Sequence, residues 1–214
     1  MTRGYPNGNR MAVPAALDGR HFLYMPEPRP LPQAAVDTLV SSVKRVVAST
    51  VLRPCQVEII TADKLDSPEA VEAHQQLTES IVTGLTCVKR AHTEILVCQQ
   101  TFPHADQGFK GTSFLSVVLH TGPNPYMHQM FDTELDEAGD QDVLPTSRLI
   151  RAGDWTVFDP TTPHIGLPLR SHQDNLLIML QCELWDEDDG DRLEILEQLP
   201  PRAGDGHVLY GSLT

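Results

Sequence analysis

The chain has 214 residues, a length typical of one domain. Its hydrophobic content of 40% and charged content of 21% are typical of a folded globular protein rather than of a disordered one. The formal net charge of -13 argues against nucleic-acid partners and against docking on anionic membranes, because both need clustered Lys and Arg. Acidic residues concentrate at 132–142 and 183–191, where we expect solvated loops.

Residues 1–33 are rich in Pro, Gly and Arg and are expected to form an extended N-terminal arm. The first ten residues lack the apolar core of a signal peptide, and no apolar run is long enough to span a bilayer. No two cysteines form a CxxC pair, so we expect buried free thiols and a cytoplasmic location. The cysteines are Cys55, Cys87, Cys98 and Cys182.

Two helices are expected after the arm. Apolar residues recur at helical spacing over about 32–48, which predicts an amphipathic helix. A second helix is expected to begin after Ser67, a plausible N-cap, and to run to about Thr83. A short strand from Val57 to Thr61 lies between the two helices.

After residue 92, short apolar runs alternate with clusters of Gly, Pro, Asn and Asp, a pattern typical of antiparallel β structure. The candidate strands are 93–100, 102–106, 113–121, 127–131, 147–151, 154–159, 163–169 and 175–185. This succession of short strands predicts a jelly roll, or double-stranded β-helix. We therefore expect a mainly β fold with the helices packed on one sheet, one domain over 34–186 and a C-terminal tail over 187–214.

A His-x-Asp sequence stands at the end of a predicted strand, at His104 and Asp106. Residues i and i+2 of a strand point to the same side, so the pair can present two metal ligands together. A third ligand can come from a distant strand, and His164 opens the strand that follows the segment GDWTVFDPTTP. Two imidazoles and one carboxylate on one face of an octahedron hold Fe(II) with open positions for substrate and oxygen.

A second His-x-Asp sequence occurs at His172 and Asp174. Only His207 follows it, in a Gly-rich tail that leaves too little chain for the intervening strands. We expect His172 and Asp174 to be turn residues. The acidic run at 185–191 is not expected to be a calcium loop, because Gly190 falls at the wrong position.

The succession of HAD, an apolar strand, GDWTVFDPTTPH and NLLIMLQCEL resembles the Fe(II)/2-oxoglutarate-dependent dioxygenases, whose signature is HxD…H on a double-stranded β-helix. The resemblance covers residues 93–185. It implies that His104, Asp106 and His164 bind Fe(II) and that 2-oxoglutarate is the cosubstrate. It also implies an activity: O2 and 2-oxoglutarate give succinate and CO2 while a small molecule or a peptide side chain is hydroxylated.

Many members of this family carry an Arg or Lys on the last strand, which pairs with the distal carboxylate of 2-oxoglutarate. The corresponding segment here ends in Asn175 and contains no cation, although a buried carboxylate needs a partner. Arg170, His120 and Lys110 are the candidates for this role, and Asn175 is a further candidate for binding the cosubstrate. Arg170 is put ahead of His120, because a guanidinium binds a carboxylate through two parallel hydrogen bonds.

Trp155 and His128 are candidates for the substrate pocket, although a strand Trp is more often a core residue. Two alternatives to the dioxygenase stay open. A cupin-like metal enzyme would share the barrel but usually carries a His-x-His pair and a Glu. A metal-free β-barrel binding module would explain the missing cation on the last strand.

Overall fold

The computed structural model describes most of the region from residue 22 to residue 184 and two short segments beyond it. The acidic segment 132–142, residues 185–191 of the second acidic segment, and Lys110 and His172 lie outside the described part. Glu183, which was expected in a solvated loop, instead lies on a strand (Leu177–Leu184) and is buried, so the solvated-loop prediction is wrong for this residue. The described residues are 11–12, 22–25, 30–49, 52, 55–83, 85–86, 91–106, 113–131, 145–170, 174–184 and 207–209.

Both expected helices are present, as α2 (Gln33–Ala48) and α3 (Pro68–Thr83). The N-cap prediction is confirmed, because the Ser67 hydroxyl accepts a hydrogen bond from the backbone N–H of Ala70 at 3.2 Å. The expected intervening strand is β3 (Glu58–Ile60), and a 3-10 turn, η1 (Ala62–Lys64), leads from it toward α3.

The eight predicted barrel strands are confirmed. They are β5 (Ala91–Cys98), β6 (His104–Asp106), β7 (Ser113–His120), β8 (Tyr126–Met130), β9 (Thr146–Ile150), β10 (Trp155–Phe158), β11 (His164–Pro168) and β12 (Leu177–Leu184). Four short strands add to them: β1 (Met11–Ala12), β2 (Phe22–Tyr24), β4 (Leu85–Thr86) and β13 (His207–Leu209). The sequence patterns did not indicate these four.

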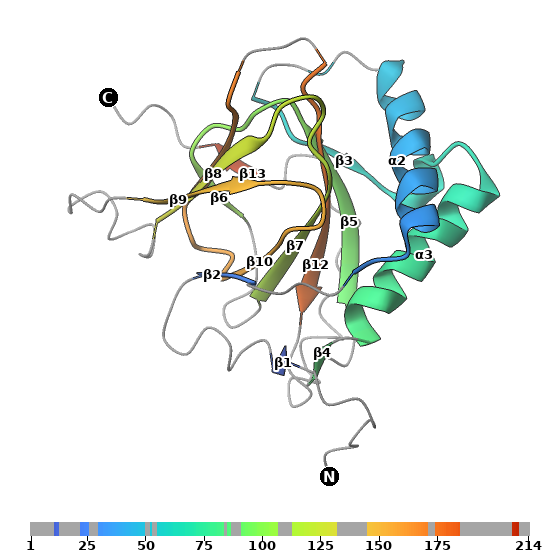
Figure 1. Ribbon diagram of the computed structural model, residues 1–214, viewed down its shortest axis with the longest axis horizontal. Helices are drawn as coiled ribbons and strands as arrows, with labels where there is room; N and C mark the ends of the chain where they lie inside the picture. Colours follow the sequence, from blue (N-terminus) through green and yellow to red (C-terminus); the bar gives the residue numbers. More distant parts are fainter. Residues whose placement is uncertain are drawn as a thin grey trace.

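The barrel strands divide between two antiparallel sheets (Figure 1). A six-stranded sheet has the order β2-β10-β7-β12-β5-β3, and a five-stranded sheet has the order β13-β6-β11-β8-β9. A separate two-stranded sheet pairs β1 with β4 in parallel. The chain passes back and forth between the two large sheets, and this is the expected double-stranded β-helix.

The helices cover the outer face of the six-stranded sheet, as predicted (Figure 1). Leu39 of α2 and Leu77 of α3 pack there against buried residues of the sheet such as Val97 and Val117. The opposite face of this sheet looks across the barrel toward the five-stranded sheet. Packing therefore leaves the barrel interior as the place where polar side chains can meet.

Three of the expected buried thiols are confirmed, since Cys55, Cys98 and Cys182 are buried and free. Among the described residues, no helix has both the length and the apolar character needed to cross a membrane.

Candidate metal centre

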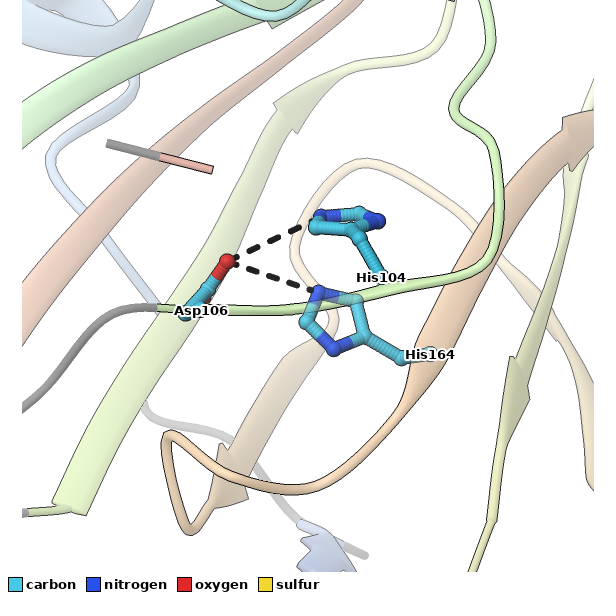
Figure 2. A group of neighbouring side chains, drawn as sticks. All are labelled: His104, Asp106 and His164. Atoms are coloured by element: carbon cyan, nitrogen blue, oxygen red, sulfur yellow. Dashed lines mark ion pairs between the residues drawn. The ribbon is translucent and has the colours of Figure 1, made fainter. Parts of the chain in front are cut away.

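Two neighbouring strands of the five-stranded sheet bring the predicted ligands together. β6 pairs with β11 so that His104 lies opposite His164, and Asp106 follows two residues along β6 on the same face. All three side chains point into the barrel interior toward one another (Figure 2). The residues are 4%, 8% and 8% exposed for His104, Asp106 and His164, so the group is shielded from bulk water.

The distances within this group suit a single metal ion. One potential ligand atom from each residue lies within 4.8 Å of the other two. Asp106 Oδ1 is 3.6 Å from His104 Nε2 and 3.9 Å from His164 Nε2. Ligands at right angles around an ion, each roughly 2.1 Å from it, would stand roughly 3 Å apart. Small side-chain rotations close that difference, so the residues fit an ion.

Backbone carbonyls fix the orientation of both imidazoles. His104 Nδ1 lies 2.8 Å from the carbonyl oxygen of Phe102, and His164 Nδ1 lies 2.9 Å from that of Thr162. A carbonyl oxygen can only accept, so each Nδ1 carries the hydrogen. Each Nε2 faces Asp106 Oδ1, and a neutral imidazole with its hydrogen on Nδ1 is the tautomer that binds a metal through Nε2.

Gln181, which the sequence analysis missed, holds the carboxylate from the opposite sheet. Its side-chain amide donates a hydrogen bond to Asp106 Oδ2 at 2.5 Å, which leaves Oδ1 facing the two imidazoles. Gln181 is itself buried on β12. Gln181 stands at an inward position of a largely apolar strand that also contains Glu183, and this pattern was the available signal. Its meaning depends on which residues lie across the barrel.

A small cavity of about 30 Å³ adjoins the three residues. Thr101, Ser116, His128 and Gln181 supply polar groups to its lining, and the rest of the wall is mainly apolar. This volume suits one or two water molecules beside an ion. A five-carbon dicarboxylate such as 2-oxoglutarate fits only if lining side chains turn aside.

His128 is the one candidate for the substrate pocket that lies at this cavity. Its ring centroid is 5.9 Å from that of His164, and burial lowers its pKa to about 3, with the neighbouring His164 and His104 acting in the same direction. The imidazole is therefore neutral at physiological pH. The Tyr24 hydroxyl lies 3.3 Å from His128 Nδ1.

Trp155 does not line the cavity at the candidate metal centre. Its side chain is 2% exposed and belongs to the core beneath the helices. The reason is strand alternation, because Trp155 and Val157 face the helices while Phe158 faces the cavity.

The candidate anchors for 2-oxoglutarate are also placed away from the three central residues. His120 and Asn175 line a different, open cavity of about 560 Å³, together with Lys44 of α2. Arg170 is exposed, and its carbonyl oxygen accepts a hydrogen bond from Asn175 Nδ2 at 2.6 Å. The structure therefore groups two of these candidates with each other but not with Asp106.

No protein-family model and no curated protein matches the sequence. Solved structures do match. The non-heme alpha ketoglutarate dependent carbocyclase SnoK from nogalamycin biosynthesis is 15% identical, with a TM-score of 0.55 over 94% of this chain and 93% of that one. The epimerase SnoN, in complex with Fe3+, alpha ketoglutarate and nogalamycin RO, is 16% identical, with a TM-score of 0.54 over 94% of each chain. A Pseudomonas putida prolyl-4-hydroxylase is 17% identical, with a TM-score of 0.52 over 82% of this chain and 97% of that one.

Identities this low show a shared fold. The chain has the double-stranded β-helix fold of the Fe(II)/2-oxoglutarate-dependent oxygenases, and it resembles them in its His104-x-Asp106…His164 arrangement.

Proposed function

We propose that the chain is an Fe(II)-dependent oxygenase that uses O2 and 2-oxoglutarate to hydroxylate a small molecule or a peptide side chain, giving succinate and CO2. The observation that carries the proposal is the convergence of His104, Asp106 and His164, with both Nε2 atoms facing the same carboxylate oxygen. The shared fold supports it.

The residues of the chain prepare the site before any ion binds. His104 and His164 each leave Nε2 available to a metal ion, because their Nδ1 hydrogens are engaged by backbone carbonyls. Asp106 offers Oδ1, because Gln181 engages the other oxygen. A bound divalent cation would offset the cost of burying the carboxylate, and iron with O2 and 2-oxoglutarate would supply the oxidation of a C–H group.

The apolar part of the cavity wall would keep bulk water from the reacting groups. Phe158 packs against the imidazole of His164 at a centroid distance of 5.0 Å, and Leu177 and Met179 line the same space. Exclusion of water protects a reactive oxidant from side reactions. The solved structures of this fold include a protein named as a carbocyclase and one named as an epimerase. We propose hydroxylation because it needs only one C–H group of the substrate to be positioned.

We further propose a cytoplasmic protein that acts without a nucleic-acid or membrane partner. The net charge of -13 supports this proposal, because phosphate backbones and anionic lipids would be repelled. A cupin-like enzyme and a metal-free binding module are not favoured. Neither accounts for two buried histidines held in the ligand tautomer around one buried aspartate.

Succinate formation tests the proposed function. Protein loaded anaerobically with Fe(II) should convert 2-oxoglutarate to succinate slowly when O2 is admitted, even without a substrate. His164→Ala should abolish the conversion, and His172→Ala serves as the matched control that retains it. Stoichiometric iron binding without any consumption of 2-oxoglutarate would contradict the proposed cosubstrate.

A further inference from the structure

Arg148 faces the barrel interior from the edge of the five-stranded sheet. It lies on β9 directly opposite His128 of β8. Ile150, two residues further along β9, lines the cavity at the candidate metal centre. Because strand residues alternate, Arg148 belongs to the same inward face as Ile150. Arg148 is half-buried, so a small molecule can reach it.

The aromatic ring of Tyr24 lies against the guanidinium group of Arg148 at the edge of the barrel. Tyr24 lies on β2, the edge strand of the six-stranded sheet, and the guanidinium carbon of Arg148 stands 5.1 Å from the centre of its ring. β2 and β9 accordingly lie on the same side of the barrel (Figure 1). The Tyr24 hydroxyl contacts both Nδ1 and the carbonyl oxygen of His128 at 3.3 Å, which holds the ring in place. A short strand from the N-terminal arm thus fixes an arginine beside the site.

This arrangement suits recognition of a carboxylate. An arginine above an aromatic ring is stabilised by the ring while its planar N–H edge stays available for two parallel hydrogen bonds. In the described part of the chain, ion pairs join Arg45 to Asp66, and Asp106 to the imidazoles of His104 and His164. Arg148 takes part in none of these pairs.

Arg148 also lies within reach of a ligand held at the metal centre. The order β11-β8-β9 places two strand spacings, about 10 Å, between the backbones of His164 and Arg148. Register places Arg148 about two residues, or roughly 7 Å, further along the strands than His164. Both side chains point inward and shorten this distance, so an acid of several carbon atoms can touch both.

We propose that Arg148, stacked on Tyr24, binds the carboxylate of a small acid that occupies the barrel beside His128. The acid is either 2-oxoglutarate, through its distal carboxylate, or the substrate itself. The assignment to a ligand at the metal centre rests on the proposed function, whereas binding of a carboxylate by Arg148 does not need the metal.

The first experiment uses metal-free protein and succinate as the probe, with calorimetric titration. Arg148→Gln should weaken succinate binding about tenfold or more, and Arg148→Lys by less, because the charge remains but the planar fork is lost. Arg151→Gln, the same change at an exposed arginine just after β9, should bind as wild type does. Tyr24→Leu should weaken binding more than Tyr24→Phe, which keeps the ring. Absence of succinate binding in wild type, or equal binding in Arg148→Gln, would overturn the proposal.

The second experiment identifies the source of the carboxylate on protein loaded anaerobically with Fe(II). 2-Oxobutyrate keeps the keto acid end of 2-oxoglutarate and lacks the distal carboxylate. If Arg148 holds that group, wild type should prefer 2-oxoglutarate, and Arg148→Gln should lose the preference. An unchanged preference, with succinate binding lost in the first experiment, assigns Arg148 to the substrate carboxylate. Loss of the preference in Arg170→Gln but not in Arg148→Gln would overturn the cosubstrate assignment. If wild type takes up no iron, the proposed function fails, and the succinate result still decides whether Arg148 binds carboxylates.

Discussion

Gln181 and Asp106 connect the two sheets of the barrel through one buried hydrogen bond. The amide of Gln181 on β12 donates to Oδ2 of Asp106 on β6 at 2.5 Å, and both residues are less than a tenth exposed. The bond fixes which carboxylate oxygen faces the imidazoles. Gln181 is therefore a positioning residue, which would act on a bound metal ion through Asp106.

Gln181→Leu should keep the fold and weaken Fe(II) binding about 10- to 100-fold, the usual cost of losing a hydrogen-bond partner of a metal ligand. Anaerobic titration with Fe(II) measures the affinity. Gln129→Leu is the matched control, because the side chain of Gln129 donates a hydrogen bond to Ser147 of the neighbouring strand β9 at an exposed place. Equal iron affinity in wild type and Gln181→Leu would show that Asp106 is held without Gln181.

Replacing Gly122 should destabilise the turn between β7 and β8. Gly122 has φ +68, and a Cβ there would lie 2.8 Å from the carbonyl oxygen of Asp174. Gly122→Ala therefore adds a backbone clash to the cost of a left-handed residue, which alone is about 1–2 kcal/mol. Gly153→Ala is the control, because Gly153 has φ +95 and open space around its Cβ position. Urea unfolding should show the larger loss for Gly122→Ala, and equal losses would exclude the clash.

The contact between α2 and the start of α3 should make stability depend on acid pH. Hydrogen bonds from Arg45 and, to a smaller extent, Ser42 lower the pKa of Asp66 from 3.8 to about 2. A carboxyl group with a lowered pKa stabilises the folded state above its unfolded pKa, and loses that contribution as pH falls from about 4 to about 2.

Asp66→Asn should consequently be less stable than wild type at pH 7, and the difference should shrink between pH 4 and pH 2. Urea unfolding at a series of pH values measures it. Asp37→Asn, at an exposed Asp that bonds to Gln33 within α2, controls for the loss of one charge. A difference between wild type and Asp66→Asn that stays constant down to pH 2 would contradict the assignment.

Much of the fold could be predicted from the sequence, because the helices and barrel strands are set by local patterns. The helical spacing of apolar residues and the Ser67 cap located both helices to within about one residue. The ligand pair in His104-x-Asp106 was also a local feature, and His164 followed from the strand–turn context before it. The short strands β2 and β13 were missed, since three residues are too few to show an alternating hydrophobic pattern. These strands form because the edge of a sheet is available for pairing.

The contacts around the site depend on long-range register, which the sequence does not display. Trp155 faces the helices because successive residues of β10 point to opposite faces of the sheet. A shift of one residue along the strand would have pointed its side chain into the barrel. Gln181 and Arg148 gain their surroundings from strands far away in the sequence. The sequence directs attention to a cation near Asn175 at the last strand, whereas the structure places an inward-facing one, Arg148, on β9.

The central claim is that His104, Asp106 and His164 bind one Fe(II), and anaerobic titration of Fe(II) into wild type, His104→Ala, His164→Ala and His172→Ala tests it most directly. Wild type and His172→Ala should bind one equivalent. His104→Ala and His164→Ala should lose stoichiometric binding while their circular dichroism spectra stay those of a folded β protein. Iron binding that persists in His164→Ala, or that is lost in His172→Ala with normal folding, would contradict the account.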